Sequence, residues 1–141
     1  MDKYDALKID NQLCFPLYAA SREIIKKYRP FLEEIGLTYT QYITMMVVWE
    51  NKSVSVKELG DKLFLDSGTL SPVLKSLEAK GCITRKRKSD DERVLTVSVT
   101  DEGERLREKA VQIPTRISSC VPLTPDEAST LYSLLYKLLR D

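Results

Sequence analysis

The side chains best suited to chemistry are three cysteines, in a chain of 141 residues that contains no histidine. Without histidine there is no Ser-His-Asp triad, no Cys-His pair and no imidazole ligand for zinc. Cys14, Cys82 and Cys120 are too far apart for a CxxC metal site, and their odd number argues against a secreted disulfide framework. We therefore expect reduced thiols with no metal and no cofactor, and thiolate chemistry is the first candidate.

Cys14 lies where the sequence predicts the start of a helix. Apolar residues recur at steps of three and four between residues 11 and 34, and Pro16 lies where a missing N–H is tolerated. Unpaired N–H groups and the helix dipole stabilise a thiolate at such a position. Tyr18, one turn on, and Tyr28 and Tyr39, which flank the corner to the next helix, could donate phenol O–H groups to it. Taken alone, these residues favour a plainer alternative, in which Cys14 is a small buried residue beside core tyrosines.

A second set of residues has the chemistry to bind DNA. A helix is predicted between an Asp66 cap and Gly81, with its larger apolar residues on one side. The opposite strip is slim enough to enter a major groove about 12 Å wide. Pro72 lies past the first turn of this helix, so we expect a local bend there. The strip comprises Ser67, Gly68, Thr69, Ser71, Pro72 and Lys75.

Basic residues gather on a β-hairpin predicted to follow this helix, with strands at 83–88 and 94–99 and a polar turn at 89–92. Such a run can contact phosphates or the minor groove, and Asp91 can orient Arg93 through an ion pair. The alternative is a solvated edge strand kept basic to prevent pairing with other strands. Helix and hairpin together, in this order, favour DNA binding. The basic residues of the hairpin are Arg85, Lys86, Arg87, Lys88 and Arg93.

The remaining elements are predicted to be helical. Thr38 or Thr40 can cap a largely apolar helix. Ser55 can cap a short helix, and Thr100 can cap another helix after the hairpin. The last helix runs over 124–140. Its apolar stripe consists of Leu131, Leu134, Leu135, Leu138 and Leu139.

This order of elements predicts a mainly α fold with a small β-hairpin, namely a winged helix-turn-helix with N- and C-terminal dimerisation helices. We expect one domain over 1–141, with dimerisation helices in 1–36 and 101–141 and a DNA-binding lobe in 37–100. The net charge of +1 predicts no partner by itself. The charged N-terminus is unlike a signal peptide and no apolar run approaches 18 residues, so a cytoplasmic location is expected.

Two stretches resemble the winged-helix core of MarR-family transcriptional regulators: LFLDSGTLSPVLKSLEAKG and ITRKRKSDDERVLTVSVTDEG. The Asp-x-Arg at Asp91 and Arg93, a strand, and then Thr100 and Gly103 match that family's wing pattern. The N-terminal run NQLCFPLYAASREIIKKYRPFLEEIGLTYTQY resembles the OhrR-type branch, whose members sense organic hydroperoxides. The resemblance covers about residues 9–115, and the C-terminal helices match only in pattern.

The OhrR-type resemblance implies that Cys14 is the peroxide-reactive residue. It further implies that Tyr28 and Tyr39 hold its thiolate across a dimer interface, with Tyr18 as a lesser partner. Cys120 lies in a position similar to that of the resolving cysteine in the two-cysteine branch, which implies an intersubunit disulfide with Cys14. The alternative is that Cys120 only packs and oxidised Cys14 pairs with a small cellular thiol. Cys82 takes a place that is usually leucine in the family, so we expect it to pack.

These observations predict a homodimeric repressor that releases a pseudo-palindromic operator when an organic hydroperoxide oxidises Cys14. A second hypothesis is a MarR-type regulator that responds to a small apolar or phenolic ligand, with Cys14 structural. A third hypothesis is a thiol peroxidase. The chain has no Thr-x-x-Cys or CxxC site, so we expect no enzyme activity.

Overall fold

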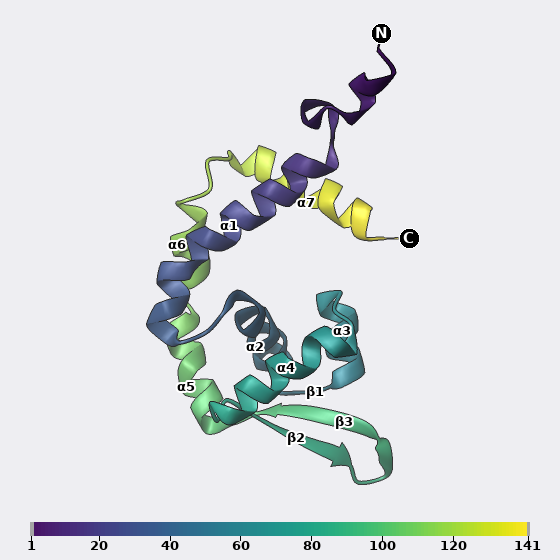
Figure 1. Cartoon of the computed structure of the whole chain (residues 1–141). Helices are drawn as coiled ribbons and strands as arrows, with labels where there is room; N and C mark the ends of the chain where they lie inside the picture. The colour runs from purple at the N-terminus through teal and green to yellow at the C-terminus, as the bar shows by residue number, and fades with distance from the viewer. Residues whose placement is uncertain (1, 141) are drawn as a thin grey trace.

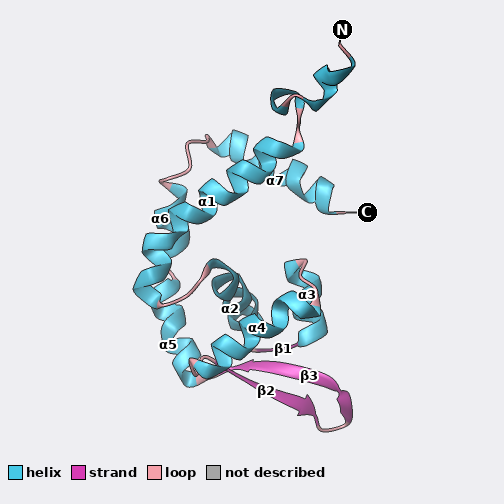
Figure 2. Cartoon of the chain, in the orientation of Figure 1, coloured by secondary structure: helices cyan, strands magenta, loops and turns pink. Residues whose placement is uncertain are grey.

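The computed structural model describes residues 2–140 and consists of a compact lobe and a set of longer helices (Figures 1 and 2). The lobe fills the lower half of Figure 1 and ends in the hairpin of β2 and β3, whereas α1 and α7 lie in the upper half. The elements are two 3-10 turns (Lys3–Leu7 and Ile9–Asn11), α1 (Cys14–Ile35), α2 (Tyr39–Asn51), β1 (Ser53–Ser55), α3 (Val56–Leu63), α4 (Ser67–Ala79), β2 (Ile83–Lys88), β3 (Asp91–Val99), α5 (Asp101–Ala110), α6 (Ile113–Ser118) and α7 (Pro125–Leu139).

Side-chain caps start the helices of the lobe where the sequence predicts. Thr38 and Gln41 form a reciprocal capping box at the start of α2. Ser55, Asp66 and Thr100 each accept the backbone N–H three residues further on, at α3, α4 and α5. Helix α1 begins at Cys14, as predicted, with no side-chain cap, so its first N–H groups lack that kind of partner.

The lobe has one apolar core, formed by α2, α3, α4 and the sheet. Trp49 ties α2 to α5, because its indole N–H donates to the Gly103 carbonyl at 2.8 Å. A side chain at Gly103 would collide with the Cys82 carbonyl, so only glycine lets α5 pass this close to the start of β2. Residues with at most 1% exposure include Met45, Val48, Leu59, Leu70, Leu74, Leu77, Ile83 and Val97.

The predicted fold class is confirmed, but the sheet is larger than a hairpin. The three-residue strand β1 pairs antiparallel with β3, which gives the order β1-β3-β2. A strand this short has no period to detect in the sequence. The hairpin turn is also tighter than predicted: β3 begins at Asp91, opposite Lys88, so only residues 89–90 form the turn.

The C-terminal part of the chain departs from the prediction in one respect. Residues 101–118 form two helices, α5 and α6, where the sequence predicts one capped by Thr100, whereas the predicted last helix is found as α7. Helix α4 continues through Pro72 from Ser67 to Ala79.

Among the helices of residues 2–140, none combines the length and apolar character that crossing a membrane requires.

Candidate functional site

Helix α4 presents the slim strip predicted from the sequence. Its apolar side, Leu70, Leu74 and Leu77, is buried in the lobe. All six residues of the predicted strip are exposed, including Pro72 and Lys75. The Thr69 N–H donates to the Asp66 carboxylate at 2.7 Å and keeps the pKa of that carboxyl below its usual value. The start of α4 is therefore fixed, with a narrow polar face open to a partner.

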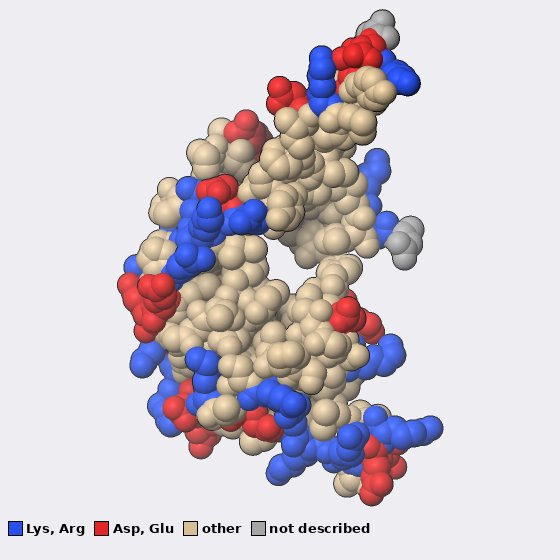
Figure 3. Space-filling view, in the orientation of Figure 1, with Lys and Arg blue, Asp and Glu red and all other residues tan. Residues whose placement is uncertain are grey.

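The hairpin of β2 and β3 carries basic side chains to the edge of the lobe, where Figure 3 shows Lys and Arg around a small acidic tip. Arg93 has 91% of its side chain exposed and is held in place by Asp91, at 3.0 Å. Two hydrogen bonds from the Arg93 guanidinium, with a third from its backbone N–H, lower the pKa of Asp91. Arg87 donates to the Glu92 carbonyl at 3.0 Å, and Lys88 is exposed.

Arg85 differs from the other basic residues of the hairpin. Its side chain is only 21% exposed and donates from Nη2 to the Glu78 carboxylate of α4 at 3.1 Å, which lowers the pKa of Glu78. Its Nε is buried and has no hydrogen-bond partner within residues 2–140. Arg85 therefore links the hairpin to α4, and its guanidinium is directed at protein rather than at solvent.

Cys14 lies exposed at the first position of α1. Tyr18, one helical turn later, is also exposed, and its hydroxyl accepts a long hydrogen bond from Arg22 at 3.4 Å. An exposed thiol at an uncapped helix start can meet a solute or a second protein chain. The alternative in which Cys14 is buried in the core of its own chain does not fit this position.

The predicted partners of Cys14 form a cluster elsewhere, at the corner between α1 and α2. The rings of Tyr28 and Tyr39 meet edge to face with centroids 4.9 Å apart, and Tyr42 lies 5.9 and 6.3 Å from them. We call these three residues the tyrosine triangle. Burial, with the neighbouring phenols, raises the pKa of Tyr28 to about 12. Burial also raises the pKa of Tyr39 and of Tyr42, so all three phenols keep the proton that a hydrogen-bond donor needs.

Sequence reasoning missed Tyr42, although its spacing of three from Tyr39 places both on one face of α2. Cys14 and Tyr28 are fourteen positions apart on the same helix, which at 1.5 Å per residue is about 21 Å. Within one chain the thiol and the tyrosine triangle therefore cannot meet.

The other two cysteines have different surroundings. Cys82 is buried at the start of β2, and burial raises the pKa of its thiol. Cys120 follows α6 and is half-buried, with its Sγ 3.6 Å from the Arg116 carbonyl oxygen. Within residues 2–140 no three His, Cys, Asp or Glu side chains are grouped so that they could hold a metal ion.

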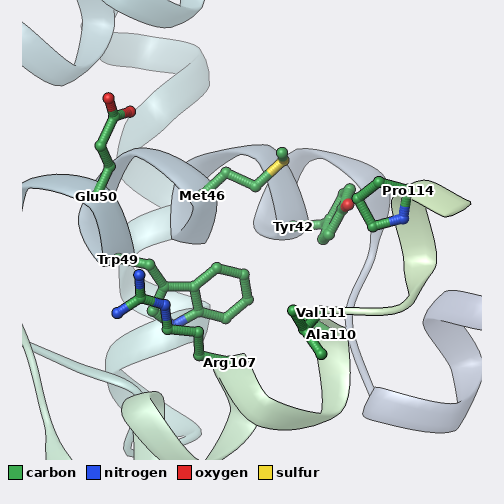
Figure 4. Close-up of a pocket in the computed structure, with 8 residues that line it drawn as sticks. All are labelled: Tyr42, Met46, Trp49, Glu50, Arg107, Ala110, Val111 and Pro114. Atoms are coloured by element: carbon green, nitrogen blue, oxygen red, sulfur yellow. The ribbon is translucent and has the colours of Figure 1, made fainter.

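Apolar surface is exposed in two regions, one beside the tyrosine triangle and one on α1 and α7. Next to the tyrosine triangle, α2, α5 and α6 enclose an open hollow of about 360 Å³, in which Tyr42, Met46, Val111 and Pro114 face one another (Figure 4). The first half of α1 and most of α7 likewise expose apolar side chains. Apolar side chains exposed there include Leu13, Phe15, Leu17, Tyr18, Leu131, Tyr132, Leu134, Leu138 and Leu139.

Comparisons with known proteins agree with this geometry. A family model described as transcriptional regulator SarA/Rot matches residues 24–110. The chain is 46% identical over 138 residues to the organic hydroperoxide resistance transcriptional regulator of Bacillus subtilis (strain 168), and the match spans 98% of this chain and 94% of that one.

Solved structures of AbfR from Staphylococcus epidermidis, in overoxidised and reduced forms that are each bound to DNA, are similar with 35% identity and a TM-score of 0.80. They cover 98% of this chain and 97% and 96% of theirs. A mutant MarR from E. coli complexed with operator DNA has the same fold, with 23% identity and a TM-score of 0.78 over 99% of this chain and 100% of that one.

Proposed function

Because this chain belongs to the SarA/Rot family of MarR-like winged-helix transcriptional regulators, we propose that it is a repressor that binds its operator when Cys14 is reduced and releases it when an organic hydroperoxide oxidises Cys14. One arrangement carries the proposal. The Cys14 thiol is exposed at the uncapped start of α1, and it cannot reach the three protonated phenols of the tyrosine triangle within its own chain. The similarity to a regulator of organic hydroperoxide resistance supports the choice of oxidant.

The repressor acts as a homodimer. Burying a large apolar side chain fully stabilises by about 1.5–3 kcal/mol relative to leaving it exposed, and the partly exposed side chains of α1 and α7 would each gain part of that on association. A twofold dimer buries each of them twice and brings Cys14 of one subunit to the tyrosine triangle of the other. The dimer also presents two copies of α4, which read half-sites about 34 Å apart.

On DNA, the exposed strip of α4 enters the major groove. Ser67, Thr69 and Ser71 offer hydroxyls to phosphates or base edges, and Lys75 offers a cation. The hairpin reaches along the duplex, with Arg93 aimed by Asp91 at the backbone or the minor groove, and Arg87 and Lys88 nearby. Both contacts come from the lobe of residues 37–100, and the dimerisation helices lie in 1–36 and 101–141.

The switch is a change of charge at one atom. The Cys14 thiolate attacks the outer oxygen of the hydroperoxide; the O–O bond breaks, sulfur is oxidised to a sulfenic acid, and the alkoxide takes a proton and leaves as an alcohol. The phenols of Tyr28 and Tyr39, with Tyr18 as a lesser partner, then lose the anion to which they donate. The subunits shift and the two α4 helices leave their half-sites.

The DNA-bound forms of AbfR are compatible with this logic. A thiolate and an overoxidised sulfinate or sulfonate are both anions, whereas a sulfenic acid or a disulfide is neutral. A switch that depends on the charge at this sulfur would therefore bind DNA at both ends of the oxidation series, as AbfR does.

Resolution of the sulfenic acid involves Cys120. Its thiolate displaces the sulfenic oxygen as water and forms a disulfide with Cys14 of the other subunit. The alternative, a small cellular thiol in the same role, is distinguished by mass spectrometry of the oxidised protein, which detects either a crosslinked dimer or an adduct on each subunit.

Fluorescence anisotropy of DNA from upstream of the protein's own gene tests the proposal. At fixed salt, the reduced wild type should bind tightly, lose affinity after one equivalent of an organic hydroperoxide, and regain it with dithiothreitol. Cys14→Ser should bind and ignore the peroxide, whereas the matched variant Cys82→Ser should still respond. Release of DNA by peroxide in Cys14→Ser would rule out the thiol switch.

The hollow of Figure 4 favours one second candidate, a regulator released by an apolar or phenolic ligand that binds between Met46 and Val111. That protein would lose DNA on addition of such a ligand in both the wild type and Cys14→Ser. A thiol peroxidase would instead consume more than one equivalent of hydroperoxide per subunit in the presence of a thiol reductant, and we expect no such turnover.

A further inference from the structure

The recognition helix α4 is joined to α2 by a partly buried hydrogen bond between side chains. The Gln41 amide donates from Nε2 to the Ser76 hydroxyl at 2.8 Å, and Gln41 is only 7% exposed. The other end of the same amide accepts the Thr38 N–H at 3.0 Å. Since both ends are occupied, the side chain cannot rotate without breaking a bond.

A second bond joins the end of α4 to the end of α1. The Lys80 ammonium donates to the carbonyl of Gly36 at 2.7 Å. Gly36 is the residue that ends α1, in a left-handed conformation with φ of 70°. The C-terminal half of α4 is thus held to both sides of the corner between α1 and α2.

That corner also carries the tyrosine triangle. Tyr39 is the first residue of α2, and Gln41 and Tyr42 follow within the same helical turn. Tyr28 packs on Tyr39 from α1. Any displacement of these rings therefore moves the first turn of α2, and with it the Gln41 amide.

Beside these bonds, buried apolar side chains of both helices, such as Met45 of α2 and Leu74 and Leu77 of α4, belong to the core of the lobe. Packing of apolar ridges into grooves leaves a scatter of about 15–20° in the angle at which two helices cross. Hydrogen bonds fix an angle and are made or lost over a fraction of an ångström. The two bonds are the parts of this junction suited to transmit a small displacement.

We propose that the Gln41–Ser76 hydrogen bond, supported by the Lys80–Gly36 bond, couples the state of the tyrosine triangle to the orientation of α4, which makes Gln41, Ser76 and Lys80 positioning residues of the redox switch. The inference rests on the proposed function, because it says how oxidation at Cys14 reaches the DNA-binding face. Ser76 is half-buried and lies outside the exposed strip, so its role is distinct from DNA contact.

Ser76→Ala tests the coupling, since it removes the acceptor and leaves the exposed strip intact. The measurement is the ratio of operator affinities before and after one equivalent of an organic hydroperoxide, for wild type, Ser76→Ala, Lys80→Met and the double variant. We expect the ratio to fall by about fivefold or more in Ser76→Ala, within the range of typical coupling between sites, with a further fall in the double variant. Ser76→Thr, which keeps the hydroxyl, should restore the ratio.

Thermal unfolding of the same variants separates coupling from a purely structural role. A structural role would lower the unfolding temperature and the affinity of the reduced protein but leave the ratio at the wild-type value, and that result overturns the inference. If the wild type itself keeps its affinity after oxidation, the proposed function fails and the coupling fails with it. If the wild type responds and Ser76→Ala responds equally, the coupling alone fails.

Discussion

In the proposed switch, protonated tyrosines take the place of histidine as hydrogen-bond donors to the Cys14 sulfur. Tyr28, Tyr39 and Tyr42 share a partly buried corner, and burial holds the pKa of each above its ordinary value. A donor that keeps its proton at every physiological pH responds only to the charge of its acceptor. The phenols therefore keep their donor protons across physiological pH, and the proposed switch would not depend on their titration.

The raised pKa of Tyr28 has a measurable effect on stability. The unfolded chain loses this proton near pH 10, whereas the folded chain keeps it to about 12. Stability that is fully present below about pH 10 is therefore lost as the pH rises toward the folded value. We expect the unfolding temperature of wild type to fall more steeply over this alkaline range than that of Tyr28→Phe. Tyr4→Phe, at an exposed tyrosine, should follow wild type, and parallel curves for wild type and Tyr28→Phe would contradict the prediction.

Two of the three hairpin arginines, Arg93 and Arg85, should behave differently on DNA. Arg93 is exposed and aimed outward, so Arg93→Ala should weaken binding to all sequences and reduce the slope of log affinity against log salt by about 1 per lost phosphate contact. Arg85 is engaged by Glu78, so Arg85→Ala should weaken binding with the slope unchanged. Equal slopes for Arg93→Ala and wild type would mean that Arg93 does not touch the backbone.

At the scale of elements, caps and close approaches set the geometry of the lobe. Thr100 links three parts of it: its hydroxyl donates to the Gly81 carbonyl at 2.6 Å and accepts the Gly103 N–H at 3.0 Å. It thus starts α5 and also holds the turn that leads from α4 into β2. The sequence predicted the cap, but not the bond to Gly81, which spans nineteen positions.

Thr100→Ala should therefore cost more than the loss of a simple cap. We expect the free energy of unfolding to fall by about 1–3 kcal/mol, since the cap and a partly buried carbonyl both lose a partner. Thr124→Ala removes the comparable cap of α7, which has no such second bond, and should cost about 1 kcal/mol. Chemical denaturation of both variants measures the difference, and equal costs would show that the Gly81 bond contributes nothing.

At the scale of the whole molecule, the single chain keeps its reactive thiol and its phenols about 21 Å apart. The apolar surface that would bring them together lies on α1 and α7 (Figure 1). In the proposed homodimer, dimerisation would assemble the sensor as well as space the two α4 helices. A monomer should lack both tight operator binding and the response of Cys14 to its partner's phenols.

A charge in the apolar stripe of α7 tests this dependence. Leu131→Lys should shift the protein to monomer in sedimentation velocity, because burying an ammonium twice across a twofold axis is unfavourable. Ser133→Lys adds the same charge on the opposite face of α7 and should remain dimeric. A dimeric Leu131→Lys would remove α7 from the interface.

The sequence by itself determined the features that depend on neighbours a few positions apart. These include the start of α1 at Cys14, the caps at Ser55, Asp66 and Thr100, and the exposed strip of α4. For α2 the sequence left Thr38 and Thr40 as alternatives, and the cap is Thr38. Helical and strand periods place such residues without reference to the rest of the chain.

Only the tertiary structure decided the contacts between elements. The Arg85–Glu78 pair, the Gln41–Ser76 bond and the packing of Tyr28 against Tyr39 join different helices and strands. Their geometry depends on how far each element is rotated and displaced when the core packs, and spacing along the chain does not encode that quantity. The proposed contact between Cys14 and the tyrosine triangle of a second chain would likewise depend on how two subunits pack, which spacing along the chain does not encode.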